Sequence, residues 1–358
     1  MLPFGPPLEP MLAKLTPQLP PEGDFLFEPK WDGFRALVFK EGDEVYLQSR
    51  VKKPLARYFP ELLEPLRAQL PTHAVLDGEI VMPRGDHLDF EALQLRLHPA
   101  KSRIDKLALE TPASFVAFDL LAEGDADLRA LPTRQRRERL ETMLAGAAPP
   151  LFLTPATTAL EVARVWFERF EGAGMDGVIA KPLDLDYQPK KRAMLKIKHR
   201  HSVDCVVAGF RWHKDGRGER VGSLLRGLYD GERLQHVGVT SSFTAKMRMA
   251  LVEELAPLRE GAQEGHPWEE WASFEGGDRR PGAESRWSQG KDLSWEPVRI
   301  ERVAEVSYDH LEGRRFRHAA TFHRWRLDRT PDSCTYDQLA MAPPAELASF
   351  FATGQLAR

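Results

Sequence analysis

The sequence predicts an α+β protein with an N-terminal domain of antiparallel sheets and flanking helices, followed by a small β-barrel domain. Its 358 residues exceed the usual size of one domain. Strand-like and helix-like segments are mixed up to residue 200, and short strands with one helix and basic loops follow. Such a barrel fits the oligonucleotide-binding (OB) fold, among other options. We therefore place the domains at residues 1–200 and 201–358.

The first domain begins with a Pro-rich stretch up to about residue 24, which we expect to be an extended lead-in. Apolar runs bounded by turn residues predict strands at 25–27, 35–39, 45–48, 74–82, 115–121 and 177–181. Apolar residues at helical spacing predict helices at 60–70, 90–97, 133–144 and 158–170. The run at 115–121 is nearly all apolar, so we expect it to be a central strand.

The second domain has a different pattern, with short strands separated by Gly-containing turns. The expected strands are 203–210, 223–229, 234–239 and 299–308, and the expected helix is 244–259. Residues 261–296 are rich in Gly, Glu and Trp and have no clear periodicity. We leave that segment without an assignment.

Composition narrows the class of protein. No run of 18 or more apolar residues occurs, so we expect no membrane helix. The first residues lack the basic and apolar regions of a signal peptide. The two cysteines, Cys205 and Cys334, are far apart and lack the spacing of a zinc site. These observations indicate a reducing compartment and a cytoplasmic protein.

Positive charge is clustered, although the formal net charge is −3. Basic residues gather at 190–201 and again at 314–329, where aromatic residues are interleaved with them. Clusters of this kind are often solvated surface. Two of them in one chain indicate a polyphosphate or nucleic-acid partner.

One short stretch, residues 28–35, contains an unusual combination of charges. Side chains alternate faces along an extended segment, so Glu28, Lys30 and Asp32 point the same way. A lysine between two acids is either a surface ion pair or a reactive amine held in place. The stretch alone does not decide between these alternatives, because short patterns recur by chance.

Further stretches place charged residues at the edges of apolar strands, where they cost free energy unless they share a partner. With residues 30–35, these stretches are 49–50, 77–79, 176–181 and 196–198. Basic and acidic groups gathered in one cleft would suit a polyphosphate with a divalent cation. We therefore expect these segments to converge in the folded chain.

The order of these stretches resembles that of the covalent nucleotidyltransferases, which include ATP-dependent DNA ligases, RNA ligases and mRNA-capping enzymes. The matching segments are 30–35, 47–50, 77–79, 115–121, 176–181 and 196–198. Residues 10–13 and 316–326 resemble the bacterial ligase C and ligase D group. No polymerase or phosphoesterase domain is present, which favours the stand-alone ligase C type. The resemblance implies an adenylation domain at 1–200 and an OB-fold domain at 201–358.

The resemblance also implies roles for individual residues, each with a simpler alternative. Lys30 would attack ATP and carry AMP, and neighbouring cations favour the neutral amine that this attack needs. Glu28 would recognise the adenine amino group; its alternative is an ion pair with a nearby lysine. Glu79 would contact ribose or metal, or else face solvent. Phe118 would stack on adenine, although a phenylalanine in a strand is more often core.

Other residues would complete the nucleotide site. Asp32 and Gly33 would shape the loop that carries the lysine. The cations would contact ribose and phosphates, and their alternative is a solvated basic surface; they are Arg35, Arg50, Lys181, Lys196 and Lys198.

Two segments depart from the family pattern. The family has glutamate where this sequence has Asp176, so the shorter carboxylate would reach a metal only through water. The last motif of DNA ligases has the form Arg-x-Asp-Lys, and here Arg326 and Asp328 are followed by Arg329. The resemblance implies that these arginines orient the pyrophosphate of ATP.

Taken together, the sequence predicts an ATP-dependent DNA ligase that seals nicks through lysyl-AMP with Mg²⁺ or Mn²⁺, in DNA repair. The expected partners are nicked double-stranded DNA and a repair polymerase, with a monomeric enzyme and no membrane. Two alternatives stay open from the sequence. One is an RNA ligase or capping enzyme, and the other is a non-catalytic nucleic-acid-binding factor.

Overall fold

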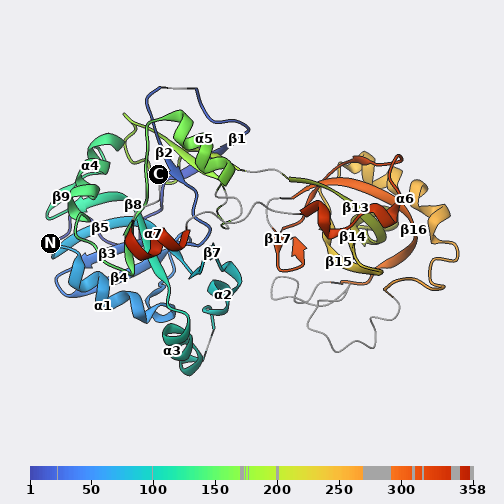
Figure 1. Cartoon of the computed structure of the whole chain (residues 1–358), viewed down its shortest axis with the longest axis horizontal. Helices are drawn as coiled ribbons and strands as arrows, with labels where there is room; N and C mark the ends of the chain where they lie inside the picture. The colour runs from blue at the N-terminus through green and yellow to red at the C-terminus, as the bar shows by residue number, and fades with distance from the viewer. Residues whose placement is uncertain are drawn as a thin grey trace. The chain divides into compact units, whose positions relative to one another are not determined.

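The computed structural model describes residues 1–21, 23–98, 100–169, 173, 175, 177–198, 201–268, 292–308, 311–316, 318–339 and 347–354. The chain divides into two compact units (Figure 1). The first unit comprises Met1–His199 together with Met341–Arg358, and the second comprises Arg200–Ala340.

The first unit contains two main sheets. The six-stranded sheet has the order β10-β8-β5-β3-β4, with β9 paired to β8. Its strands are β3 (Phe34–Glu41), β4 (Glu44–Ser49), β5 (His73–Val81), β8 (Ser114–Glu123), β9 (Ala126–Asp127) and β10 (Leu151–Leu153). The strand predicted at 115–121 is β8, and its central place between β5 and β10 is confirmed. It is buried along most of its length, because apolar residues occupy both of its faces.

The second sheet of this unit is four-stranded, in the order β1-β12-β11-β2. Its strands are β1 (Leu12–Thr16), β2 (Phe25–Pro29), β11 (Val178–Pro182) and β12 (Arg192–Ile197). A separate hairpin joins β6 (Pro83–Arg84) to β7 (His87–Leu88). The prediction of antiparallel sheets holds for most described pairs, but β1–β12 and β8–β10 are parallel. The predicted lead-in therefore contains a sheet strand, β1.

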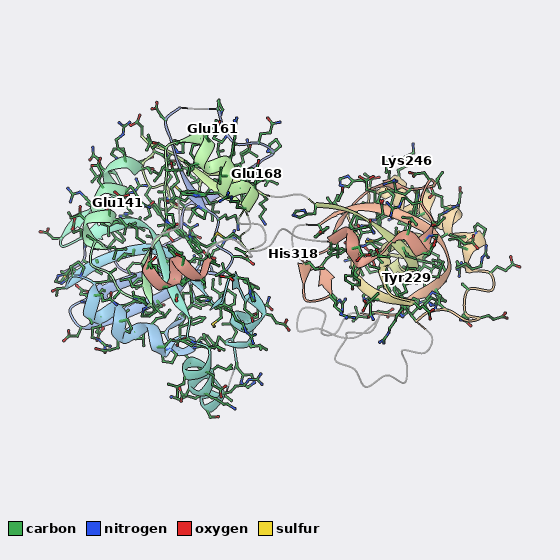
Figure 2. All side chains as sticks on the ribbon, viewed as in Figure 1. Glu141, Glu161, Glu168, Tyr229, Lys246 and His318 are labelled. Carbon is green, nitrogen blue, oxygen red and sulfur yellow. The ribbon has the colours of Figure 1, made fainter. Side chains whose placement is uncertain are left out.

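Helices cover these sheets. They are α1 (Pro60–Gln69), α2 (Phe90–Leu95), α3 (Lys101–Glu110), α4 (Thr133–Met143), α5 (Leu160–Arg169) and α7 (Leu347–Thr353). Helix α5 is amphipathic: Leu160 and Ala163 face the core with Phe27, whereas Glu161 and Glu168 are exposed (Figure 2). The sequence analysis did not predict α3 or α7. Among the described residues, none of the helices combines the length and apolar character that crossing a membrane requires.

The second unit is built on a five-stranded sheet in the order β15-β14-β13-β16-β19. The strands of this unit are β13 (His201–His213), β14 (Gly216–Asp230), β15 (Arg233–Thr240), β16 (Glu296–Tyr308), β17 (Leu311–Glu312), β18 (Arg315–Phe316) and β19 (Thr321–Trp325). The predicted helix is α6 (Ala245–Arg259), and the predicted strands fall within β13 to β16. Most of the unassigned segment, residues 269–291, lies outside the described residues.

The C-terminal helix α7 differs from the sequence analysis. The predicted second domain of residues 201–358 needs correction at its C-terminal end, because α7 packs in the first unit. Phe350 is fully buried there in a cluster with Trp31 and Phe152. A seven-residue helix gives no strong local signal, and its partners lie far away in the sequence.

Candidate active site

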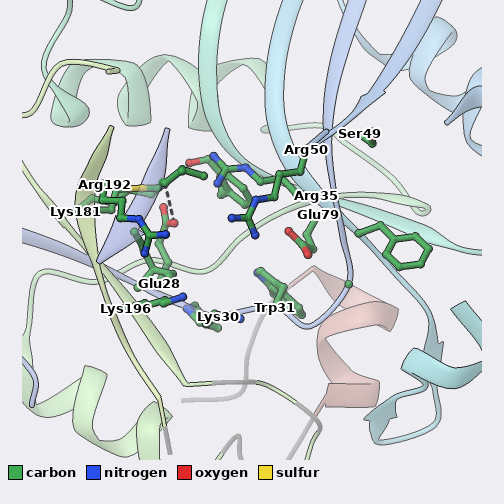
Figure 3. Close-up of a pocket in the computed structure, with 18 of the residues that line it drawn as sticks. Glu28, Lys30, Trp31, Arg35, Ser49, Arg50, Glu79, Lys181, Arg192 and Lys196 are labelled. Carbon is green, nitrogen blue, oxygen red and sulfur yellow. Dashed lines mark hydrogen bonds and ion pairs between the residues drawn. The ribbon is translucent and has the colours of Figure 1, made fainter. Parts of the chain in front are cut away.

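A cavity of about 430 Å³ opens in the first unit, lined by residues from both of its main sheets. Most of the predicted site residues line it, and Figure 3 shows many of them converging there. They are Glu28, Lys30, Gly33, Arg35, Arg50, Glu79, Phe118, Lys181 and Lys196. The predicted convergence of charged strand edges therefore exists, and the cavity has a size typical of small-molecule sites.

The loop that carries Lys30 follows β2 and is held on both sides. The Lys30 amide donates to the Gly177 carbonyl oxygen at 2.9 Å. Gly33 touches β5 so closely that a Cβ there would lie 2.2 Å from the Ile80 carbonyl oxygen. Between them, the Trp31 indole donates from Nε1 to Thr154 Oγ1 at 2.8 Å. Only glycine fits at position 33, which explains the glycine of this motif.

Several cations line the pocket together with Lys30. Lys30 and Lys196 lie at the same side of the pocket (Figure 3). Burial lowers the pKa of Lys196, and repulsion from Lys198, Lys30, Arg192 and Arg50 lowers it further. Such a group of positive charges is suited to a polyphosphate rather than to a neutral ligand.

Arg35 is held in place by a buried carboxylate. Its Nε and Nη2 donate to the two oxygens of Asp77 at 2.9 and 2.5 Å. Tyr187 also donates from its hydroxyl to Asp77, at 2.6 Å, and accepts from the Met11 amide at 3.0 Å. Burial opposes the charge on Arg35, but Asp77 outweighs it and raises the arginine pKa. The guanidinium lies 5.2 Å from the centre of the Phe118 ring, so it borders the pocket as a fixed cation.

Glu28, on β2, lines the same pocket. Its Oε2 pairs with Lys181 Nζ at 2.8 Å, and that amine also donates to the Phe118 carbonyl oxygen at 2.7 Å. Its Oε1 is buried and has no hydrogen-bond partner among the described residues. Arg137 Nη1, which is also buried without such a partner there, lies 3.6 Å from this oxygen. Burial raises the pKa of Glu28, and Lys181 and Arg137 oppose the rise.

Glu79 supplies the other carboxylate of the pocket. Burial raises its pKa to about 8, although Lys30 and Arg35 draw it down. No cluster of three or more His, Cys, Asp or Glu side chains occurs in the described part of the chain. Mg²⁺ is commonly bound by one or two carboxylates together with substrate phosphates, so Glu79 in a pocket lined by cations fits this mode of binding.

Some predicted residues lie elsewhere. Asp32 is buried within the loop that carries Lys30, and neither it nor Lys198 lines the cavity. Arg326 and Arg329 belong to the second unit, where their Nη1 atoms lie 2.8 and 3.3 Å from Asp204 Oδ2. Asp176 lies outside the described residues.

The sequence analysis missed four residues of this site. Arg192 lines the cavity, and its basic run at 190–192 was the available signal. Trp31 also lines the cavity, inside the motif itself. Arg137 contacts Glu28, and Tyr187 contacts Asp77, the partner of Arg35; no local pattern marks either residue.

Comparison with known proteins gives the family. The model described as "ATP dependent DNA ligase domain" matches residues 10–198. The model described as "ATP dependent DNA ligase C terminal region" matches residues 217–329. The chain belongs to the ATP-dependent DNA ligases.

Two relatives of this ligase are similar over nearly the whole chain. DNA ligase C2 of Mycolicibacterium smegmatis is 56% identical over 347 residues, which cover 96% of this chain and 97% of that protein. DNA ligase C of Mycobacterium tuberculosis is 52% identical, and the match covers 94% and 95% of the two chains. The predicted membership of the ligase C group is thereby confirmed.

The fold is confirmed as well. A solved structure described as a Lig E DNA ligase has a TM-score of 0.54 and 17% sequence identity, covering 88% of this ligase and 99% of that chain. Together with the two family matches, it identifies an adenylation domain followed by an OB-fold domain.

Proposed function

We propose that this ligase seals nicks in double-stranded DNA and that Lys30 is its nucleophile. One observation carries the assignment: Lys30 lines a pocket whose other basic residues include Arg35, Arg50 and Lys196. These cations would neutralise phosphate charge beside the amine. The glycine-restricted loop would hold the amine in a fixed direction.

The reaction would have three steps. First, the neutral Lys30 amine attacks the α-phosphorus of ATP; a nitrogen–phosphorus bond forms, pyrophosphate leaves and the amine gives up a proton. Second, the 5′-phosphate of the nick takes AMP from Lys30. Third, the 3′-hydroxyl attacks that 5′-phosphorus and releases AMP. The pocket cations would stabilise the charge that develops on phosphate oxygens in each step.

The contacts of Glu28 and Lys181 support a base-recognition role for this part of the pocket. The partnerless Oε1 of Glu28 would accept a hydrogen bond from the adenine amino group, and Phe118 would stack on the ring. Lys181 was predicted to hold phosphates, but its bonds to Glu28 and to the Phe118 carbonyl favour the base end. Arg35, Arg50, Arg192 and Lys196 are then the candidates for the phosphates.

A divalent metal, when bound, would neutralise phosphate charge. Glu79 would hold it, because this half-buried carboxylate is the one that faces Lys30 and Arg35. The choice between Mg²⁺ and Mn²⁺ stays a prediction, as does the role of Asp176.

The decisive experiment is mass spectrometry of the protein after incubation with ATP and Mg²⁺. We expect an AMP adduct on the peptide that contains Lys30 and none on Lys30→Ala. Sealing of a labelled nicked DNA duplex should be lost in the same variant. An adduct that persists in Lys30→Ala would overturn the assignment, and a wild type without any adduct would revive a non-catalytic role.

We also propose that the enzyme acts in DNA repair with a repair polymerase as partner. We expect it to be a cytoplasmic monomer, and we place the start of its second domain near residue 201. The resemblance to the ligase C and ligase D group supports the repair role. The molar mass of the purified chain, measured by light scattering, tests the monomeric state. Pull-down from cells that contain the polymerase tests whether the two proteins bind.

A further inference from the structure

The residue next to the nucleophile is packed against the far end of the chain. Trp31 is 4% exposed and lines the same cavity as Lys30. Its indole nitrogen is fixed by Thr154, but its ring faces need apolar partners. Figure 3 shows a helix beside Trp31, and this helix is α7.

Two adjacent phenylalanines of α7 supply those partners. The Phe350 ring centre lies 5.2 Å from that of Trp31, and the Phe351 ring centre lies 6.0 Å away in an edge-on arrangement. Both rings also pack on Phe152, at 5.5 and 5.2 Å. Aromatic pairs at these separations attract one another beyond the burial of area. Phe350 is fully buried in this contact.

The order of the chain makes this contact informative. Helix α7 follows the whole second unit in sequence, yet it belongs to the first unit. The chain therefore leaves the adenylation domain once and returns to it. The returning segment contains α7, which packs against Trp31, the residue next to Lys30. Leu347 and Phe350 of α7 belong to one buried cluster with Trp31 and Phe152, so the surface that this helix covers includes the ring beside Lys30.

We propose that α7 is a positioning element for self-adenylation, in which Phe350 and Phe351 fix the Trp31 ring and thereby the direction of the Lys30 amine. The proposal rests on the proposed role of Lys30 as nucleophile. The backbone of the loop is held at Lys30 and at Gly33, and Trp31 lies between these two points. The packing of its ring therefore influences the conformation of the segment that carries the amine. Loss of its aromatic partners would let the loop rotate and misdirect the amine, and small misplacements of reacting groups reduce rates strongly.

The test uses the full chain with Phe350→Ala and Phe351→Ala combined. Single-turnover formation of the AMP adduct at saturating ATP should slow by on the order of 10- to 100-fold, with the KM for ATP changed by less than about 3-fold. Phe39→Ala is the matched control, because Phe39 is an equally buried phenylalanine of the same domain in another cluster. We expect adduct formation in the control to stay within about 2-fold of wild type at a temperature where both proteins are folded.

A second substrate separates positioning from general damage. Sealing of a nick that already carries AMP bypasses the attack by Lys30, so the double variant should retain it within about 3-fold of wild type. Equal losses in both reactions, or adduct formation no slower than in Phe39→Ala, would overturn the proposal. If the double variant does not fold, Phe351→Ala alone removes the half-buried ring and should show the same selective loss on a smaller scale. Failure of the proposed function can be distinguished from failure of this positioning role, because the wild-type protein itself would then form no AMP adduct.

Discussion

Glu28 and Arg137 form an incomplete pair at the base end of the pocket. Each has one buried polar atom without a hydrogen-bond partner among the described residues, and these atoms lie 3.6 Å apart. An ionised Glu28 would accept from the 6-amino group of adenine and repel the 6-oxo group of guanine or hypoxanthine. The positive charges of Lys181 and Arg137 would stabilise that ionised form. The negative charge of Asp119 would oppose it.

Arg137→Gln should therefore weaken the preference for ATP over ITP. Loss of a charged neighbour of a buried acid commonly costs about 1–3 kcal/mol, which predicts a rise of about 5- to 150-fold in the KM for ATP and a smaller rise for ITP. The measurement is adduct formation with each nucleotide. Glu141→Gln is the control, because Glu141 binds Arg137 from the exposed side. Equal changes for both nucleotides would contradict the role of Arg137 in base selection.

Glu79 gives a pH dependence. Its pKa of about 8 means that the free enzyme keeps this carboxyl protonated at neutral pH, and metal binding must displace the proton. At limiting Mg²⁺, adduct formation should rise as pH increases toward about 8 and level off above it. Because the folded state binds the proton more tightly than the unfolded chain, the contribution of Glu79 to stability declines as pH rises from 4.5 to about 8.

The titration of Glu79 can be distinguished from that of other groups. Raising the Mg²⁺ concentration should move the inflection to lower pH, because metal and proton compete for one carboxylate. Glu79→Gln should abolish this dependence on Mg²⁺. An inflection that stays at one pH across a hundredfold range of Mg²⁺ would exclude Glu79 as the metal-binding carboxylate.

At the scale of elements, one buried ion pair joins α1 to the end of α2. Arg96 is fully buried and donates to both Glu61 oxygens, at 2.7 and 2.8 Å. Its guanidinium also donates to the carbonyl oxygens of Tyr58 and Thr111, and it lies 5.1 Å from the centre of the Phe59 ring. This arginine therefore holds together segments that the sheet does not connect.

Glu61→Ala should destabilise the adenylation domain by about 3–5 kcal/mol, because it leaves a buried guanidinium without its counter-charge. Thermal unfolding of the full chain gives the measurement. Glu64→Ala, on the same helix, removes the surface partner of Arg67 and should change stability by less than about 0.5 kcal/mol. Similar effects of the two variants would mean that burial adds nothing to the Glu61 pair.

At the scale of the molecule, two units are connected twice, once near residue 200 and again near residue 340. The second unit presents exposed cations at the β13–β14 hairpin, among them Lys214 and Arg217. A protein that neutralises DNA phosphates releases bound counterions, so its affinity depends on salt. This hairpin is therefore a candidate for contact with the DNA backbone.

Binding to a nicked duplex should weaken steeply with salt, by on the order of 10³–10⁵ between 50 and 200 mM if 6–10 phosphates are contacted. The double variant Lys214→Ala, Arg217→Ala should reduce the slope of log K against log salt by about 2 and leave AMP-adduct formation unchanged. Fluorescence anisotropy at several salt concentrations provides the slopes. An unchanged slope would remove the hairpin from the interface.

The sequence predicted most of the site because its key residues belong to local motifs. Lys30 with Gly33, and Glu79 with its neighbouring strand, occur in segments whose order alone indicates a nucleotidyltransferase. It did not predict Tyr187, which donates to Asp77 across a separation of 110 residues. It predicted Lys181 among the phosphate-binding cations but gave no sign of its ion pair with Glu28, which only the folded chain shows.

The sequence by itself determined the fold class and the ligase family, and it singled out Lys30 as the proposed nucleophile, because periodicity and motif order are properties of neighbouring residues. Only the tertiary structure decided that the last helix returns to the first domain and that its phenylalanines contact Trp31. It also decided which buried cations stand behind Glu28. These contacts join segments that are far apart in the chain, and their free energy comes from burial and charge pairing that exist only after folding.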